Sequence, residues 1–385
     1  MSDKPRRICS ITGSRADYGL LFYVWKALQE APRLELQRVI TGMHLCPEFA
    51  PDLAAIEKDG LPVSARVDME WQGDSPADTA RAVGRGVLGF VEALERLKPD
   101  VVLALGDRVE MFAAAAAAAL MNLPLAHLHG GEVTGGIDES LRHAISKLSH
   151  LHLVATELSG ERLRKMGEEP WRIHVVGAPG LDYIKNLRPL AKQELAASLD
   201  LDLERPVIIA TLHPILTELE EAAWQAREFM ESLVGSGEQV VVTYPNLDPG
   251  GRRQAAVIEE YRGRPGVRIA VNLSQPVYLS LLGTAAAMVG NSSSGLLEAP
   301  SFGLPVVNIG TRQQGRERAE NVIDVGYSRE EILGGLKRAL GDREFRERAR
   351  ACRNPYGDGN SGPRIARLLS ETPITHELLQ KRLTY

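Results

Sequence analysis

The fold of this chain is constrained most by an alternation of short apolar runs with helical segments, which begins at residue 7 and restarts at residue 207. Apolar runs that alternate with helices in this way predict a parallel sheet with helices packed on both faces. The expected strands of the first half cover residues 7–12, 34–41, 101–105, 123–128, 151–155 and 173–176. Those of the second half cover residues 207–211, 239–243, 267–269, 286–289 and 306–309. We therefore expect an α/β protein with two Rossmann-like domains.

A densely charged stretch with two prolines, residues 185–206, lies between the two series of strands. This composition is typical of a linker between domains. We predict an N-terminal domain over residues 1–188, which carries the candidate carboxylates, and a C-terminal domain over residues 189–364. A last helix over about residues 365–385 is expected to pack back on the N-terminal domain.

The composition argues against several classes of protein. The chain has 385 residues, of which 44% are hydrophobic and 25% charged, as is ordinary for globular domains with large cores. Its formal net charge of −5 gives no basic surface, so no nucleic-acid partner is expected. The longest apolar run, residues 111–121, is too short to cross a bilayer, and the chain enters its first strand without an apolar signal segment. Neither export nor membrane anchoring is expected.

The cysteines Cys9, Cys46 and Cys352 are odd in number and far apart. This spacing argues against a disulfide framework and against a cysteine-based metal site, and it favours a reducing cytoplasm. His127, His129 and His143 are close in sequence, but a zinc site is the less favoured interpretation of them. We expect a cytoplasmic protein with no metal ion and no cofactor.

Polar residues gather after two neighbouring strands of the first half. Asp107 and Arg108 follow the strand at 101–105, and the loop 129–138 follows the strand at 123–128. Ligands of parallel sheets bind outside the carboxyl ends of the strands. A single Asp107 at a helix start is more often an N-cap than a catalytic group. The loop, however, contains four glycines with Glu132 and Asp138, and it is longer than the 2 to 6 or so residues that such a connection usually needs. These three carboxylates are candidate catalytic groups.

The first strand is followed by a glycine turn and the start of a helix, with Arg15 in the turn sequence GSRADYG. A helix start offers free N–H groups to a phosphate, and Arg15 could add a charged contact. The same pattern also serves as a purely structural turn, and both readings stay open.

The strands of the second half also end in polar residues. Ser292 and Ser293 lie in the sequence NSSSG, which fits a phosphate cradle at a helix start, with an ordinary serine N-cap as the alternative. Glu298, close behind, would repel a phosphate and suits a pair of hydroxyls, as on a ribose. Arg312 suits an anion. His213, directly before a proline, reads equally well as a core histidine and as a site residue.

Taken in order, the motifs GSRADYG, GDRVE, HGGEVTGGIDESLRHAISKLSH, HP, YPNLDPG, GNSSSG and GTRQQGRE resemble those of the hydrolysing UDP-N-acetylglucosamine 2-epimerases. The resemblance implies two Rossmann-like domains of the GT-B type that face each other across a cleft. It implies catalytic roles for Asp107, Glu132, Asp138 and His213. It implies nucleotide-sugar contacts by Arg15, Arg108, Asn246, Ser292, Ser293, Glu298 and Arg312.

Enzymes of this family make N-acetylmannosamine or related sugars for the synthesis of sialic-acid-type compounds. The resemblance thus implies a small-molecule nucleotide-sugar substrate, no cofactor, and a homodimer or homotetramer. UDP-N-acetylglucosamine is the expected substrate, with UDP- or GDP-linked N,N′-diacetylbacillosamine as the alternative. A GT-B glycosyltransferase and a catalytically silent nucleotide-sugar binding module are the competing functions. Three carboxylates at strand ends argue against the silent module.

Overall fold

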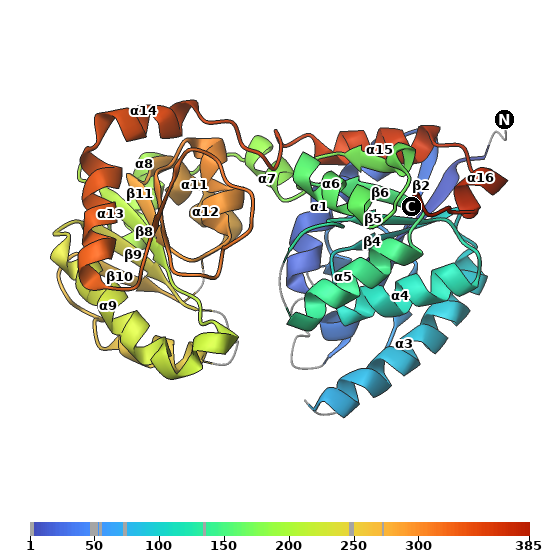
Figure 1. The fold of residues 1–385 in the computed structure, drawn as a ribbon, viewed down its shortest axis with the longest axis horizontal. Coiled ribbons are helices and arrows are strands. Elements are labelled where there is room, and N and C mark those ends of the chain that lie inside the picture. Colours follow the sequence, from blue (N-terminus) through green and yellow to red (C-terminus); the bar gives the residue numbers. More distant parts are fainter. Residues whose placement is uncertain are drawn as a thin grey trace. The chain divides into compact units, whose positions relative to one another are not determined.

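The computed structural model describes residues 4–46, 53, 56–71, 75–133, 136–245, 250–271 and 273–385. Figure 1 shows the ribbon with its labelled elements. The chain divides into two compact units, an N-terminal unit of Met1–Lys185 with Tyr356–Tyr385 and a C-terminal unit of Asn186–Pro355. The predicted boundaries, after residues 188 and 364, lie three and nine residues beyond these.

The N-terminal unit contains, among its described residues, a seven-stranded sheet in the order β3-β2-β1-β4-β5-β6-β7, and its strand pairs are parallel. The strands are β1 Arg6–Thr12, β2 Leu34–Thr41, β3 Ala65–Val67, β4 Val101–Leu105, β5 Leu125–Leu128, β6 Leu151–Val154 and β7 Ile173–Val175. The longer helices are α1 Arg15–Glu30, α3 Pro76–Leu97, α4 Val109–Leu120, α5 Gly136–Leu148 and α6 Glu157–Lys165. The short elements are η1 Gly42–Leu45, η3 Pro170–Arg172 and α7 Leu181–Lys185.

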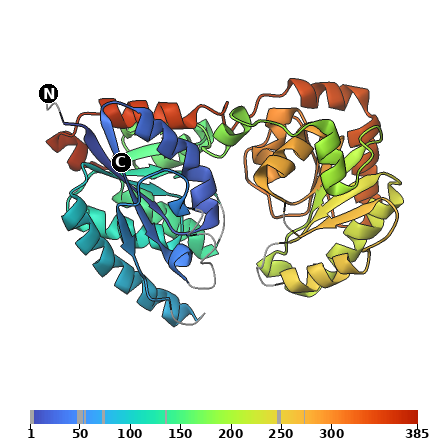
Figure 2. The same cartoon turned by 180° about the vertical axis from the view of Figure 1, so that it is seen from behind.

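The C-terminal end of the chain completes the core of the N-terminal unit. Helix α15 (Ser361–Glu371) lies beside α1, red against blue in Figure 2, and α16 (His376–Leu379) follows it. Ile365, Leu369 and Leu378 are buried in the same cluster as Leu21 and Leu28 of α1. Burying a side chain of this size stabilises a fold by roughly 1.5 to 3 kcal/mol. The N-terminal unit is therefore built from both ends of the chain.

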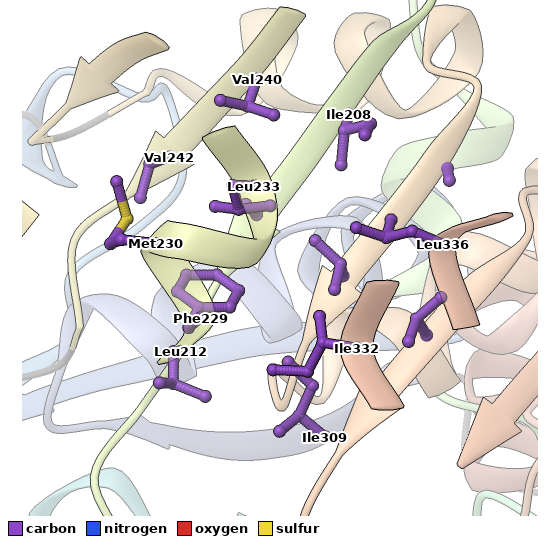
Figure 3. Packing of buried hydrophobic residues seen from close by; sticks show 14 of the residues in the cluster. Ile208, Leu212, Phe229, Met230, Leu233, Val240, Val242, Ile309, Ile332 and Leu336 are labelled. Carbon is purple, nitrogen blue, oxygen red and sulfur yellow. The ribbon is translucent and has the colours of Figure 1, made fainter. Parts of the chain in front are cut away.

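The C-terminal unit contains, among its described residues, a six-stranded sheet in the order β10-β9-β8-β11-β12-β13, again with parallel pairs. Its strands are β8 Val207–Thr211, β9 Gln239–Thr243, β10 Val267–Ala270, β11 Ala287–Gly290, β12 Val306–Ile309 and β13 Val322–Val325. Its helices are α8 Lys192–Leu199, η4 Leu216–Glu221, α9 Ala222–Gly235, α10 Gly251–Glu259, α11 Gln275–Thr284, α12 Ser294–Leu297, η5 Ala299–Phe302, α13 Arg329–Gly341 and α14 Arg343–Ala351. Figure 3 shows α9 and α13 packed on one face of this sheet through Phe229, Leu233, Ile332 and Leu336.

The predicted fold class, two parallel α/β domains, is confirmed. Two short strands were not expected: β3 at one edge of the first sheet, and β13, which follows the expected last strand in the second. The helix predicted after NSSSG is divided into two short elements, α12 and η5. The α-helix cannot continue through Pro300, because proline lacks the backbone N–H that the next helical hydrogen bond needs. Within the described part of the chain, no helix is both long and apolar enough to cross a membrane.

The strand order positions the polar strand ends. In each sheet the order reverses beside the first strand, between β1 and β4 in one unit and between β8 and β11 in the other. Ligands of open parallel sheets bind at such reversal points, outside the carboxyl ends of the strands. The loops that follow these strands are therefore the places to look for a site.

Candidate functional site

The structure brings two of the three predicted catalytic carboxylates together in the N-terminal unit. Asp107 follows β4, in a turn where Gly106 has the positive φ of 72° that favours glycine. Glu132 follows β5, which pairs with β4. A buried arginine from α5, Arg142, joins them: its Nη2 donates to Asp107, and its Nη1 lies 4.0 Å from Oε2 of Glu132. Asp107 is thus not the N-cap of α4; Arg108 occupies that position without a side-chain cap bond.

The third carboxylate, Asp138, lies in the first turn of α5, and its side chain is exposed. Residues four apart on a helix share a face, so Asp138 and Arg142 are neighbours on α5. Sequence reasoning did not select Arg142 as a site residue. This helical spacing from Asp138 was the signal that could have found it.

Two histidines from the end of β5 shape the loop that carries Glu132. His129 has a positive φ of 59°, a backbone conformation that is strained for any residue other than glycine. Its Nδ1 is hydrogen-bonded to Oε1 of Glu132. His127 lies 2.7 Å from the carbonyl of Gly106 through Nε2 and 3.0 Å from Oγ of Ser146 through Nδ1. Because a carbonyl only accepts, Nε2 carries the proton and Nδ1 accepts from the serine. Burial lowers the pKa of His127 to about 3, so this imidazole is neutral.

The turn after β1 forms a second polar cluster of the N-terminal unit. Ser14 is the N-cap of α1, and Arg15 is exposed in the first turn of that helix. Asp17 is buried and accepts from the backbone N–H of Gly13 at 3.2 Å. Burial is the main reason that the pKa of Asp17 is raised to about 6.

Arg108 lies beside this cluster, where its charge is already partly matched. Its Nη2 donates to Oε1 of the fully buried Glu110 at 3.2 Å, and its Nε lies 4.0 Å from Asp17. Glu110 was not expected as a site residue. A Cβ at Gly42 would come within 2.6 Å of Oε1 of Glu110, so the glycine leaves room for this carboxylate.

In the C-terminal unit, Asn291 holds two predicted site residues together. Its Oδ1 accepts from the backbone N–H of His213 at 2.6 Å, and its Nδ2 donates to the carbonyl of His213 at 2.8 Å. Its own carbonyl accepts from Nη1 of Arg312 at 3.1 Å and from Gln313 at 2.8 Å. The loops after β8, β11 and β12 are joined in this way. Burial, with Arg312 as a second cause, lowers the pKa of His213 to about 4.

The approach of these loops depends on Gly290, the last residue of β11. Its φ is 130°, and a Cβ there would lie 1.8 Å from the carbonyl oxygen of Thr211 in β8. A larger residue cannot be placed without moving one of the two strands. The loop with Arg312 has a further anchor, because Thr311 donates to the carboxylate of Glu218 at 2.6 Å.

The predicted phosphate cradle at Ser292 and Ser293 opens a helix of only four residues, α12. A serine does occupy the N-cap position, since Ser293 is the N-cap residue, but its side chain makes no cap bond. The hydroxyl of Ser292 accepts from the N–H of Ser294 at 3.4 Å. The helix dipole is small in so short an element, so a phosphate bound there would rely mostly on hydroxyl and N–H groups. Burial raises the pKa of Glu298, whose Oε2 has no hydrogen-bond partner among the described residues. Asn246, the remaining predicted contact, lies outside the described residues.

The described residues contain no group of three or more His, Cys, Asp or Glu side chains arranged to hold a metal ion. Four arginines place positive charge near the strand ends: Arg15, Arg108, Arg142 and Arg312. Carboxylates paired with arginines in the N-terminal unit are suited to proton transfer and to stabilising a cation.

Comparison with known proteins agrees with this reading of the fold. A family model described as UDP-N-acetylglucosamine 2-epimerase matches residues 26–370. The hydrolysing UDP-N,N′-diacetylbacillosamine 2-epimerase of Legionella pneumophila is 40% identical over 380 residues, 99% of this chain and 100% of the relative. A UDP-N-acetylglucosamine 2-epimerase of Neisseria meningitidis is 33% identical over 335 residues, 87% of either chain.

A solved structure shows the same fold. The crystal structure of a UDP-GlcNAc 2-epimerase from Neisseria meningitidis, bound to UDP-GlcNAc, matches with a TM-score of 0.79 at 21% identity and covers 95% of this chain and 100% of that one. At this identity the match speaks for the fold alone, which is of the GT-B type. The extent of the sequence matches settles the family: this chain belongs to the UDP-N-acetylglucosamine 2-epimerases.

Proposed function

We propose that this protein is a hydrolysing 2-epimerase that converts UDP-N-acetylglucosamine and water into N-acetylmannosamine and UDP. The observation that carries the proposal is the pair Asp107 and Glu132, which lie at the ends of adjacent strands on either side of the buried Arg142. Two carboxylates on one site are what a reaction with a cationic sugar intermediate and a proton transfer requires.

The reaction begins with an elimination. As the C1–O bond to the diphosphate breaks, the sugar ring gains oxocarbenium character and the C2 hydrogen becomes acidic. One carboxylate stabilises the cation, and another removes the C2 proton. The products of this step are 2-acetamidoglucal and UDP, which takes the electron pair of the broken C1–O bond.

The second step is a hydration of the glycal. A water molecule adds its oxygen to C1, and a proton is delivered to C2 on the face opposite to the one it left. This gives the free sugar with the configuration at C2 inverted. Asp107, Glu132, Asp138 and His213 are the proposed acid, base and cation-stabilising groups.

The leaving diphosphate needs positive charge and hydrogen-bond donors. From their motifs, we assign these roles to Arg15, Arg108, Arg312, Ser292 and Ser293. The carboxylate of Glu298, with an unpartnered oxygen among the described residues, suits the ribose hydroxyls. Asn246 is assigned to nucleotide-sugar binding from its motif alone.

A second substrate is favoured by one comparison. The Legionella pneumophila relative, 40% identical along nearly the whole chain, is a hydrolysing UDP-N,N′-diacetylbacillosamine 2-epimerase. The same elimination and hydration apply to that sugar, because its C1 and C2 carry the same groups. The two substrates differ only at positions remote from the bond that breaks.

Product analysis tests both proposals. NMR spectra of reactions with UDP- and GDP-linked N-acetylglucosamine and N,N′-diacetylbacillosamine would identify the sugar released. Specificity constants for the four combinations decide the substrate, and a preference of about a hundredfold, roughly 3 kcal/mol, for a GDP-linked or diacetamido substrate would exclude UDP-N-acetylglucosamine as the main one. Sugar transfer that needs an added acceptor, with no free sugar formed, would make the protein a glycosyltransferase instead.

A further inference from the structure

We propose that Arg142 is a positioning residue that keeps Asp107 and Glu132 ionised at the same time. The inference deepens the proposed function and rests on it for the catalytic roles of the two carboxylates. It assigns a task to a residue that is not among the predicted contacts with substrate.

The contacts of Arg142 connect groups from two separate loops. Its Nη2 donates to Asp107 behind β4, and its Nη1 donates to the carbonyl of His129 behind β5 at 2.7 Å. The same Nη1 lies 4.0 Å from Oε2 of Glu132. The side chain of Arg142 is only 6% exposed, so solvent screens these interactions little.

The strained backbone of His129 agrees with this role. A positive φ at a residue other than glycine costs of the order of 1 to 3 kcal/mol and persists where surrounding contacts maintain it. Here the carbonyl of His129 binds Arg142 and its Nδ1 binds Glu132, so both hydrogen bonds depend on this conformation. The histidine connects the arginine to the second carboxylate.

Charge explains why an arginine is needed at this position. The side chains of Asp107 and Glu132 are 20% and 10% exposed, so little solvent screens the repulsion between their negative charges. A cation beside two carboxylates offsets this repulsion and favours the charged form of both. With Arg142 present, one carboxylate can stabilise the sugar cation while the other accepts the proton.

Other charged groups also face this pair and have to be considered. Arg108 interacts with Asp107, but it is shared with Glu110 and Asp17. His127 is neutral because burial lowers its pKa to about 3. Further titratable or charged groups on the described parts of these elements are His129, which is bonded to Glu132, and Arg162, which donates to the carbonyl of Gly131. Helix α5 also carries Asp138, Lys147, and the pair Glu139 and His143 at 3.7 Å. Among these described groups, Arg142 is the cation that contacts both strand-end loops.

The test compares the pH dependence of kcat/KM in three proteins: wild type, Arg142→Gln and Arg142→Lys. We expect Arg142→Gln to lose about a hundredfold or more in kcat/KM and to shift the acidic limb of its profile upward by about 1 to 3 pH units. Lysine keeps the charge but not the planar fork, so Arg142→Lys should retain the wild-type limb and recover only part of the rate. An acidic limb that stays in place in Arg142→Gln, or that moves equally in Arg142→Lys, would overturn the proposal.

Arg172→Gln is the matched control. Arg172 is also a buried arginine of the N-terminal unit, but it donates to the carbonyls of His150, Glu377 and Leu378 and to Glu169. This variant should be less stable and should keep the acidic limb of the wild type.

A separate readout covers the case in which the wild type releases no sugar from any of the four nucleotide sugars. That result would refute the proposed function but not the proposal that Arg142 keeps the two carboxylates ionised. The infrared difference between wild type and Asp107→Asn reports the ionisation of Asp107 without substrate. Its midpoint should rise when Arg142→Gln is introduced, and an unchanged midpoint would refute the role of Arg142.

Discussion

At the scale of single residues, the proposed chemistry depends on carboxylate groups rather than on side-chain size. We predict that Asp107→Asn, Glu132→Gln and Asp138→Asn each fold but lose about 10² to 10⁴ in turnover, because each substitution removes an acid or base. The measurement is the rate of free-sugar formation followed by NMR. Release of 2-acetamidoglucal by one variant would show that elimination survives there while hydration fails.

Asp100→Asn is the control for this series. Asp100 precedes β4, at the opposite end of the strand from Asp107, and forms a partly exposed ion pair with Arg7 at 3.3 Å. A partly exposed pair contributes little, so turnover should stay at the wild-type rate. Wild-type turnover in any of the three site variants would remove that residue from the mechanism.

The positive charge at the strand ends leads to a second prediction at this scale. Since arginines and backbone N–H groups are proposed to stabilise the diphosphate, activity should persist after treatment with EDTA. Turnover measured before and after chelation, with metal analysis of the same samples, checks this. A stoichiometric metal ion whose removal abolishes turnover would contradict it.

At the scale of elements, Asn291 joins the loops that follow three strands of the C-terminal unit. We predict that Asn291→Ala raises KM and lowers kcat/KM by about tenfold or more, because His213 and Arg312 lose a shared anchor and a one-ångström displacement is costly in a site. Steady-state kinetics on the preferred nucleotide sugar measure the effect.

Asn308→Ala separates this effect from a loss of stability. Asn308 is equally buried in β12 and donates to Oδ1 of Asp324 at 2.8 Å. Both variants should unfold at a lower denaturant concentration, and only Asn291→Ala should change KM. Equal kinetic effects of the two would mean that Asn291 has no particular part in positioning.

The sequence predicted long, uniformly apolar elements well and irregular ones poorly. Continuous apolar runs such as VVLAL at β4 and VIIAT at β8 are typical of parallel strands that are buried on both faces. The strands β3 and β13 were missed because they are short and carry a charged residue, ARV and VIDV, as edge strands do.

At the candidate site, the sequence could predict residues that directly follow a strand. Ligands bind outside the carboxyl ends of parallel strands, and the order of residues along the chain is enough to apply this rule. It did not select Arg142 or Asn291, whose partners come from loops distant in sequence. Glu110 was also missed, although its partner Arg108 lies only two residues away. Which side chains meet across those loops depends on strand order and on close approaches such as that at Gly290. Whether the selected residues act in catalysis stays a prediction.

At the scale of the whole molecule, buried neutral histidines predict sensitivity to acid. Burial lowers the pKa of His127 to about 3 and, as the main cause, that of His150 to about 4, both below the ordinary value of about 6.5. As the pH falls below about 6.5, the unfolded chain binds protons that the folded chain does not. Each histidine should then cost about 1.4 kcal/mol of stability per pH unit until its folded pKa is reached.

Urea unfolding between pH 7.5 and 4.5 measures this slope. Protonation of Asp17, whose pKa is raised to about 6, opposes the loss in part. His127→Asn should be less stable at pH 7.5 but show a smaller slope below pH 6.5. His376→Asn, which replaces an exposed histidine of α16, should keep the wild-type slope. Stability that stays constant down to pH 5 would contradict the prediction.

The return of the chain from the C-terminal unit to the N-terminal one also has a consequence for synthesis on the ribosome. Asn186–Pro355 holds all the strands of its sheet, so this unit can fold as soon as that length has emerged. The N-terminal unit is translated first but lacks Ile365, Leu369 and Leu378 until the last codons are read. Until then α1 can pack on the strands of its own unit, but the part of its apolar surface that α15 covers stays exposed. The half of the protein that is made first is therefore finished last, and a chaperone could bind this nascent surface.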